Sequence, residues 1–288
     1  MLALSDISVD PPLPGRDDTL VLAFRAVLAW HGCDMAYDDL ARRTGCAAMF
    51  TFSTGEACPR RWDTYARDAF LIAASRELGL SLRDLHPPDA VPLPDAPPEF
   101  ELHFRDSYIP LIEASLANGQ PVLAWAGWPS PDELSWGVVT ALDPQRRCRG
   151  LVPGRAGPVT LARAAWQCYV VQQFRAGEPS ASASMPSAVR ARLISAWQND
   201  LPAASGVSSG LTALRHWREG LTVEPCCPIH GGTDCVESLT RRFVARCPHA
   251  ADALHDAGLV AAARALRAVR ATAGLPSALD EVLRLLPG

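Results

Sequence analysis

The sequence contains no lysine: all 27 basic residues of this 288-residue chain are arginines. Without a lysine side chain, the protein cannot form a Schiff base with pyridoxal phosphate or with a carbonyl substrate. It also cannot supply the phosphate-binding lysine of a Walker motif. These classes of enzyme are therefore excluded.

The net charge is also small, and long apolar runs are absent from the sequence. The formal net charge is −4, which gives no reason to expect nucleic acid or an anionic membrane as a partner. No stretch of 18 uncharged apolar residues occurs, so we expect no membrane-spanning helix. Residues 1–18 lack the basic segment and apolar run of a secretion signal. We therefore expect a cytoplasmic protein whose nine cysteines are thiols and not a disulfide framework.

The sequence does contain enough apolar residues, 48% of the total, for a sizeable core. Apolar periodicity in the first part of the chain predicts helices at 17–32, 36–44, 64–79 and 107–118. Short β-branched or aromatic runs between turn residues predict strands at 121–126, 136–143 and 168–174. Residues 86–100 carry six prolines and predict an extended connector.

The composition changes after these strands. Residues 176–187 are rich in serine and alanine, which is typical of a linker. All later periodic segments predict helices, at 188–199, 207–220, 234–246, 250–272 and 277–286. The sequence therefore predicts an α+β domain over 1–175, a linker over 176–187 and an all-α domain over 188–288.

Several motifs carry more specific information. The first helix reads DDTLVLAFRAVLAWHG at 17–32 and is followed by YDDLARRTGCAAMFTF at 37–52. A later strand reads SWGVVTALDP at 135–144, and the helical region contains GLTALRHWREGL at 210–221. This set resembles the papain-like bacteriocin-leader (double-glycine) peptidases, and more nearly their divergent bacterial relatives of the butirosin biosynthesis protein H group. The resemblance implies a papain-like cysteine-peptidase fold, in which an N-terminal helix packs on a small antiparallel sheet, followed by an all-α region.

The same resemblance places other residues at the catalytic positions. Papain-like chemistry needs a thiolate at a helix N-terminus, a histidine that takes its proton and a third group that orients the histidine. Here Thr19 stands at the position of the cysteine, Trp136 at that of the histidine and Val152 at that of the orienting aspartate. The oxyanion-hole glutamine has no counterpart in residues 10–18. The motifs therefore predict a degenerate active site, in which Thr19 has the alternative role of capping the helix.

Tryptophans offer a possible ligand site near these positions. Trp62, Trp125, Trp128 and Trp136 supply enough indole to line a small apolar pocket beside the former cleft, with Thr19 at its edge. The alternative is that these side chains are core residues and that Trp136 fills the space of the lost imidazole.

Cysteine and histidine form one dense cluster between Cys226 and His249. Within it, Cys227, His230 and Cys235 have ligand types that zinc can accept, but their spacing matches no strong zinc pattern and favours buried structural thiols. Separately, Cys58 adjoins two arginines that favour a thiolate and is the candidate reactive thiol. Its alternative interpretation is an ordinary loop cysteine.

Three functional hypotheses follow. The first is a non-catalytic papain-like module that binds a peptide, a small molecule or a partner protein in a degenerate peptidase cleft. The second, implied by the resemblance, is an acyl or γ-glutamyl transferase of natural-product biosynthesis that acts on a carrier protein and uses a displaced thiol such as Cys58. The third is a metal- or redox-sensing protein that uses the Cys226–His249 cluster. The first hypothesis needs no cofactor, whereas the third admits zinc.

Overall fold

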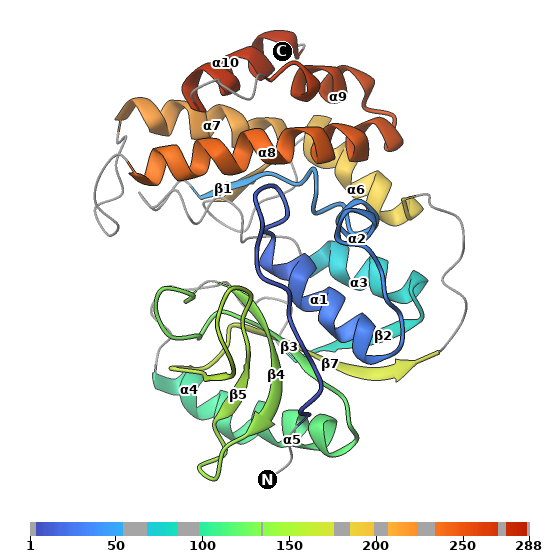
Figure 1. The fold of residues 1–288 in the computed structure, drawn as a ribbon, viewed down its shortest axis with the longest axis vertical. Coiled ribbons are helices and arrows are strands. Elements are labelled where there is room, and N and C mark those ends of the chain that lie inside the picture. The colour runs from blue at the N-terminus through green and yellow to red at the C-terminus, as the bar shows by residue number, and fades with distance from the viewer. Residues whose placement is uncertain are drawn as a thin grey trace. The chain divides into compact units, whose positions relative to one another are not determined.

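The computed structural model describes residues 4–53, 68–85, 98–133, 135–175, 185–198, 207–223, 234–269 and 275–286 (Figure 1). The chain divides into two compact units. Unit 1 comprises residues 1–12, 18–37 and 75–181, and unit 2 comprises residues 13–17, 38–74 and 182–288. The predicted α+β class is confirmed, since an N-terminal helix packs on a six-stranded antiparallel sheet and a mainly helical region follows.

Unit 1 is built around the six-stranded antiparallel sheet, with strand order β2-β7-β3-β4-β5-β6. The predicted strands form its centre: β3 (Val122–Trp125), β4 (Trp136–Leu142) and β7 (Gln167–Phe174). Three further strands complete the sheet: β2 (Leu80–Asp84), β5 (Cys148–Leu151) and β6 (Val159–Thr160). Strands β2 and β5 contain no β-branched or aromatic residue, and β6 is only two residues long, so their sequences contain little strand signal.

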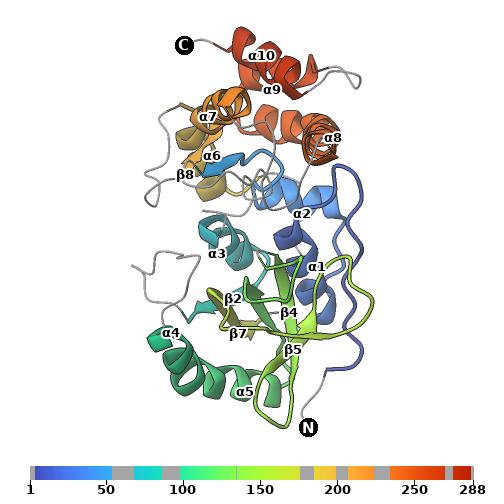
Figure 2. The same ribbon diagram turned by 90° about the vertical axis from the view of Figure 1, so that its left-hand side faces the viewer.

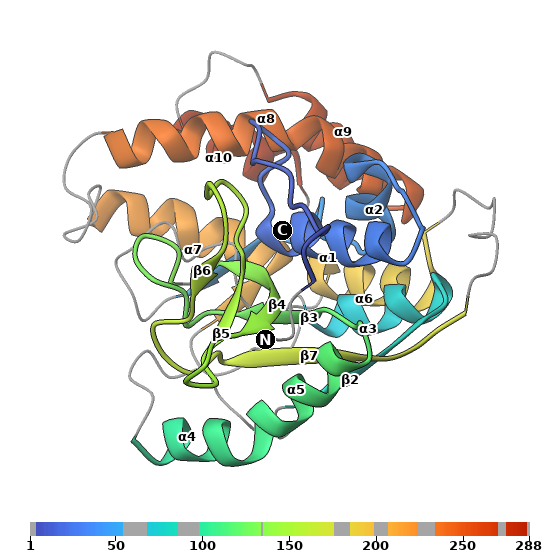
Figure 3. The ribbon, with the colours of Figure 1, turned by 60° about the horizontal axis from the view of Figure 1, so that its bottom comes forward.

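Helices cover both faces of this sheet (Figures 2 and 3). One face contacts α1 (Thr19–Trp30), a helix that buries eight of its residues and is therefore largely a core element. The other face contacts α5 (Ile109–Ala117), which continues α4 (Pro98–His103) and the π-helical turn η2 (Phe104–Tyr108). The predicted connector was wrong at its end, because residues 98–100 are helical; proline is well tolerated in the first turn of a helix. The rest of that connector, 86–97, lies outside the described residues.

Unit 2 is mainly helical. Its C-terminal helices are α6 (Ser187–Gln198), α7 (Gly210–Val223), α8 (Asp234–Asp256), α9 (Val260–Arg267) and α10 (Leu275–Leu285). Earlier parts of the chain supply α2 (Tyr37–Arg43) and β1 (Thr51–Ser53), while the boundary between the units falls within α3 (Asp68–Glu77). Strand β1 pairs antiparallel with β8 (Val207–Ser209).

Three predictions for this region were wrong. The helix expected at 250–272 is interrupted, because α8 ends at Asp256 and α9 begins at Val260. Residues 207–209 were expected to be helical but form β8, because they pair with a strand that lies far away in the sequence. The expected break between 246 and 250 does not exist, since α8 runs through Pro248. Proline removes one backbone hydrogen bond, but a continuous stripe of buried residues supports the helix on both sides of it. These residues are Phe243, Cys247, Ala250, Ala251 and Leu254.

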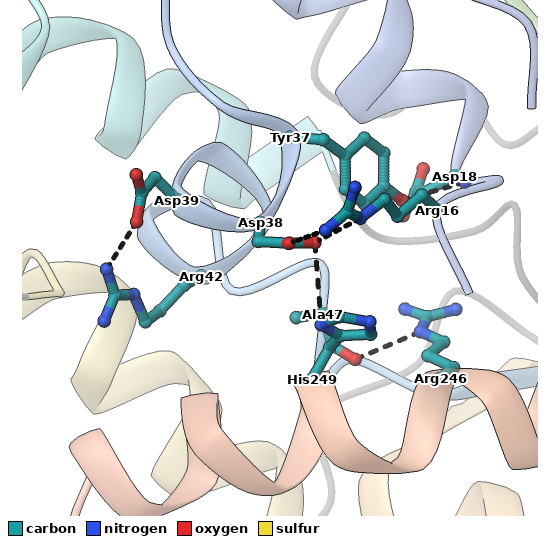
Figure 4. Close-up of polar contacts among 9 residues, drawn as sticks. All are labelled: Arg16, Asp18, Tyr37, Asp38, Asp39, Arg42, Ala47, Arg246 and His249. Carbon is teal, nitrogen blue, oxygen red and sulfur yellow. Dashed lines mark hydrogen bonds and ion pairs between the residues drawn. The ribbon is translucent and has the colours of Figure 1, made fainter. Parts of the chain in front are cut away.

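Residues 38–53 are held in unit 2 by buried polar contacts. The Arg246 guanidinium donates from Nε to the backbone carbonyl of Ala47 at 3.0 Å (Figure 4). It also donates from Nη2 to the carbonyls of Met49, at 3.1 Å, and Cys46. The Trp197 indole N–H donates to the carbonyl of Ala48 at 3.0 Å. The chain therefore differs from the predicted division at 175, because residues 38–74 cluster with the helical unit and not with the sheet.

Across the described ranges, no helix combines the length and the apolar character needed to cross a lipid bilayer.

Candidate functional site

The structure brings Thr19 and Trp136 into contact. Thr19 is the first residue of α1, Trp136 is the first residue of β4, and the two are 117 positions apart in the sequence. The backbone N–H of Trp136 donates a hydrogen bond to Thr19 Oγ1 at 3.1 Å. A residue at the start of the buried helix therefore lies beside a residue at the start of the neighbouring strand.

Thr19 does not cap its helix. The N-cap is Asp18, whose Oδ1 accepts the backbone N–H of Leu20 at 3.0 Å. The backbone N–H of Asp18 in turn donates to the Tyr37 hydroxyl at 3.0 Å. The alternative capping role of Thr19 is thus wrong, because a side chain with two carboxylate oxygens already accepts the free N–H group at this helix end. The threonine hydroxyl is left to contact β4.

Trp136 is a core residue. Only 2% of it is exposed, and its ring stacks on Tyr169 (centroids 5.9 Å apart, rings at 28°) and packs against Trp125 at 6.4 Å. In register, Trp125 pairs with Trp136 on one side and with Gln167 on the other. Directly paired residues of an antiparallel sheet point to the same face, so these side chains form one row.

The predicted tryptophan pocket is only partly assembled. Trp125 and Trp136 lie together, but both are buried, so their side chains fill the interior and leave little indole surface at the protein surface. Trp128 lies against Gly137, whose hypothetical Cβ would come within 2.6 Å of the indole. Adjacent residues of a strand point to opposite faces of the sheet, so a side chain at Gly137 would point away from the Trp136 face. Trp128, which lies against Gly137, is therefore on the face opposite to Trp136. Trp62 lies outside the described residues.

Val152, the residue that the motifs place at the position of the orienting aspartate, has an apolar side chain. It follows Leu151, which pairs with Val138 on β4, and its side chain is buried in the apolar cluster beneath α5. A valine side chain has no hydrogen-bonding atom, so position 152 cannot orient a neighbouring base.

The described thiols with shifted pKa values are poor nucleophiles. Burial, aided by the negative charge of Asp143, raises the pKa of Cys148 to about 12. Burial also raises the pKa of Cys168, with smaller contributions from Cys148 and Asp84, and it raises the pKa of Cys247 in unit 2. These thiols are neutral at physiological pH, and a neutral thiol neither attacks a carbonyl carbon nor binds a metal ion well. The candidate reactive thiol Cys58 lies outside the described residues.

The predicted zinc ligands cannot be placed. Cys227 and His230 lie outside the described residues, and Cys235 falls in the first turn of α8 without a described side chain. His249, at the end of the predicted cluster, has its Nδ1 3.5 Å from an Asp38 carboxylate oxygen, and the same carboxylate pairs with Arg16 (Figure 4). Within the ranges that the structure covers, no group of three or more potential metal ligands occurs.

One polar pair was missed from the sequence. Ser208 Oγ on β8 lies 3.0 Å from His216 Nδ1 on α7. A signal for it was present, since residues 206–210 read G-V-S-S-G, a G-x-S-x-G run directly before a helix.

No protein-family model matches this chain, and no curated protein matches it. The resemblance to papain-like peptidases therefore depends on the quoted motifs alone.

Proposed function

We propose that unit 1 is a non-catalytic papain-like module that binds a peptide, a small molecule or a partner protein next to Thr19 and Trp136. One observation carries the proposal: the two positions that the motifs assign to nucleophile and base are adjacent, since the backbone N–H of Trp136 donates to Thr19 Oγ1 at 3.1 Å, but their side chains are a hydroxyl and an indole. Neither side chain can accept a proton at neutral pH, so a bound peptide bond is held without being cleaved.

The polar groups around this contact favour a ligand that carries a hydrogen-bond acceptor. Thr19, Ser135 and Gln167 are all half-buried, and they surround the aromatic row at the ends of β3, β4 and β7. In the described part of the chain, Trp136 Nε1 is buried without a hydrogen-bond partner. An unsatisfied buried donor costs about 1–3 kcal/mol. A ligand carbonyl oxygen recovers this free energy if its binding displaces the side chains that cover the indole N–H. A peptide backbone supplies such oxygens.

The papain-like geometry can be tested by restoring its reactive groups. We expect the thiol introduced by the double substitution Thr19→Cys, Trp136→His to react with iodoacetamide at pH 6 at least about tenfold faster than the same thiol in Thr19→Cys alone. The reason is that an imidazole next to a thiol at a helix N-terminus stabilises the thiolate. Peptide mapping by mass spectrometry separates the introduced thiol from the native cysteines. Equal alkylation rates in two folded variants would show that positions 19 and 136 do not form a nucleophile–base pair.

Peptide binding can be followed at the indole itself. In protein labelled with ¹⁵N-tryptophan, we expect N-acetylated peptide amides from a short-peptide library to shift the Trp136 Nε1–H resonance. Trp136→Phe assigns that resonance, whereas Trp136→Ala is unsuitable because removing a buried tryptophan costs about 3–5 kcal/mol. Thr19→Val should weaken binding, since it removes a polar contact next to the indole, whereas Thr160→Val on the edge strand β6 should not. A library that shifts other tryptophan resonances but never that of Trp136 would move the binding site elsewhere.

The acyltransferase and sensor hypotheses depend on Cys58 and on Cys227 and His230, which lie outside the described residues. No observation favours either of them.

A further inference from the structure

Unit 2 contains a serine and a histidine in hydrogen-bond contact. Ser208 lies on β8 and is 5% exposed, and its Oγ is 3.0 Å from Nδ1 of His216. His216 lies about two turns into α7 and is half-buried, so the buried serine has a partly exposed histidine beside it. This is the separation that proton transfer from a hydroxyl to an imidazole requires.

The backbone around Ser208 places the serine beside a helix N-terminus. Strand β8 passes directly into α7 at Gly210, whose φ is +57° and whose hypothetical Cβ would overlap the carbonyl oxygen of Ala196. Only glycine fits this turn. The Gly210 N–H donates to the Phe50 carbonyl at 2.8 Å, and the following N–H groups, of Leu211 and Thr212, have no acceptor within the helix.

The electrostatics of this helix end suit a developing negative charge. The first turn of α7 contains no acidic residue, so the partial positive charge of the helix dipole is not neutralised by a carboxylate of that turn. Backbone N–H groups at a helix N-terminus are a recurrent stabiliser of oxyanions in acyl transfer. The glycine, and not the serine, adopts the left-handed conformation here, so the turn differs from the nucleophile elbow of α/β-hydrolases.

We infer that Ser208 and His216 form a nucleophile–base pair that accepts an acyl group from an activated ester. This activity belongs to unit 2 and is independent of the binding function proposed for unit 1. Ser208 Oγ attacks the carbonyl carbon, a C–O bond forms and the hydroxyl proton passes to His216 Nδ1. The tetrahedral intermediate then collapses, the bond to the leaving alcohol breaks and His216 returns the proton to it. Water repeats the same steps on the acyl-serine, which releases the carboxylic acid and restores both side chains.

The acyl-serine is the expected readout, because turnover should be slow. Within the described ranges, no carboxylate contacts the other ring nitrogen of His216, and a histidine without an orienting group is a weaker base. The absence of lysine helps the measurement, since amine acetylation is confined to the N-terminus of the chain.

The full chain is treated with p-nitrophenyl acetate, and the burst of p-nitrophenolate and the site of acetylation are measured by absorbance and peptide mapping. We expect close to one acetyl group per chain on Ser208. Ser208→Ala should abolish the burst, and His216→Gln, which keeps a hydrogen-bonding side chain but not a base, should slow it about a hundredfold. Ser115→Ala is the matched control, because Ser115 is also a buried serine (8% exposed) but donates to the Gln120 carbonyl and not to a histidine.

Far-UV circular dichroism and thermal unfolding establish that each variant is folded. The mapped site in the unmodified chain decides the question even if Ser208→Ala fails to fold. No acetylation of Ser208, or equal acetylation in the parent and in folded His216→Gln, would overturn the inference and leave the hydrogen bond with a structural role only.

Discussion

Replacing Arg246 with methionine is expected to destabilise unit 2 by about 3 kcal/mol or more. The guanidinium is buried, donates to the carbonyls of Cys46, Ala47 and Met49, and lies 5.1 Å above the centroid of the Phe50 ring. Methionine has a similar length but no donor, and each buried carbonyl left unsatisfied costs about 1–3 kcal/mol. Urea unfolding followed by circular dichroism measures the difference.

Two further arginine variants make this result interpretable. Arg246→Lys should lie between the parent and Arg246→Met, since an ammonium keeps the charge but cannot reproduce the planar donor geometry of a guanidinium. Arg267→Met is the matched control, because its side chain is 49% exposed and its 2.7 Å ion pair with Asp252 contributes at most about 1 kcal/mol. Equal unfolding midpoints for Arg246→Met and Arg267→Met would contradict the assigned role of Arg246.

The second large effect is expected from cutting the chain at the linker. A fragment of residues 182–288 should lack a cooperative unfolding transition, although it contains all the C-terminal helices. In the whole chain, residues 46–50 are all buried, and the Phe50 ring centroid lies 6.1 Å from that of Trp197 and 5.6 Å from that of Phe243. In the fragment, strand β8 also has no β1 to pair with. Without these residues, the apolar faces of α6 and α8 are exposed to water, and the fragment buries too little apolar surface to offset its chain entropy.

A matched fusion protein tests the cause. Residues 38–74 joined to 182–288 by a flexible glycine–serine linker should recover a cooperative transition, whereas the same fusion with Phe50→Ser and Met49→Ser should not. Thermal unfolding by calorimetry distinguishes the three proteins. A cooperative transition of 182–288 alone would show that the helices form an independent domain, as the sequence composition predicted.

Elements with a local sequence signal were predictable, and elements that depend on distant contacts were not. The helix at 17–32 and the central strands of the sheet were predictable, because their periodicity and bounding turn residues lie within the segment itself. Strand β8 was not, since Val207–Ser209 is three residues long and is extended only because it pairs with Thr51–Ser53. The assignment of residues 38–74 to unit 2 depends on similarly distant contacts, which a residue-by-residue analysis does not contain.

The candidate site was predictable to a similar extent. The motifs pointed to Thr19 and Trp136, and these residues are in contact. The burial of Trp125 and Trp136 and the position of Trp128 on the opposite face depend on strand register, which the sequence did not specify. The contact between Ser208 and His216 joins a strand to a helix, and only the G-x-S-x-G run indicated it.

The interleaved order of the two units also constrains how this protein folds as it is synthesised. Ala47 and its partner Arg246 are 199 positions apart, which at ordinary rates of translation corresponds to a delay on the order of ten to forty seconds. For most of that interval the apolar segment around Phe50 has been synthesised while α8, which contributes Phe243 and Arg246 to its surroundings, has not. Nascent chains should therefore expose this apolar segment until α8 emerges, and cell-free synthesis should yield less aggregated protein when a chaperone holdase is added.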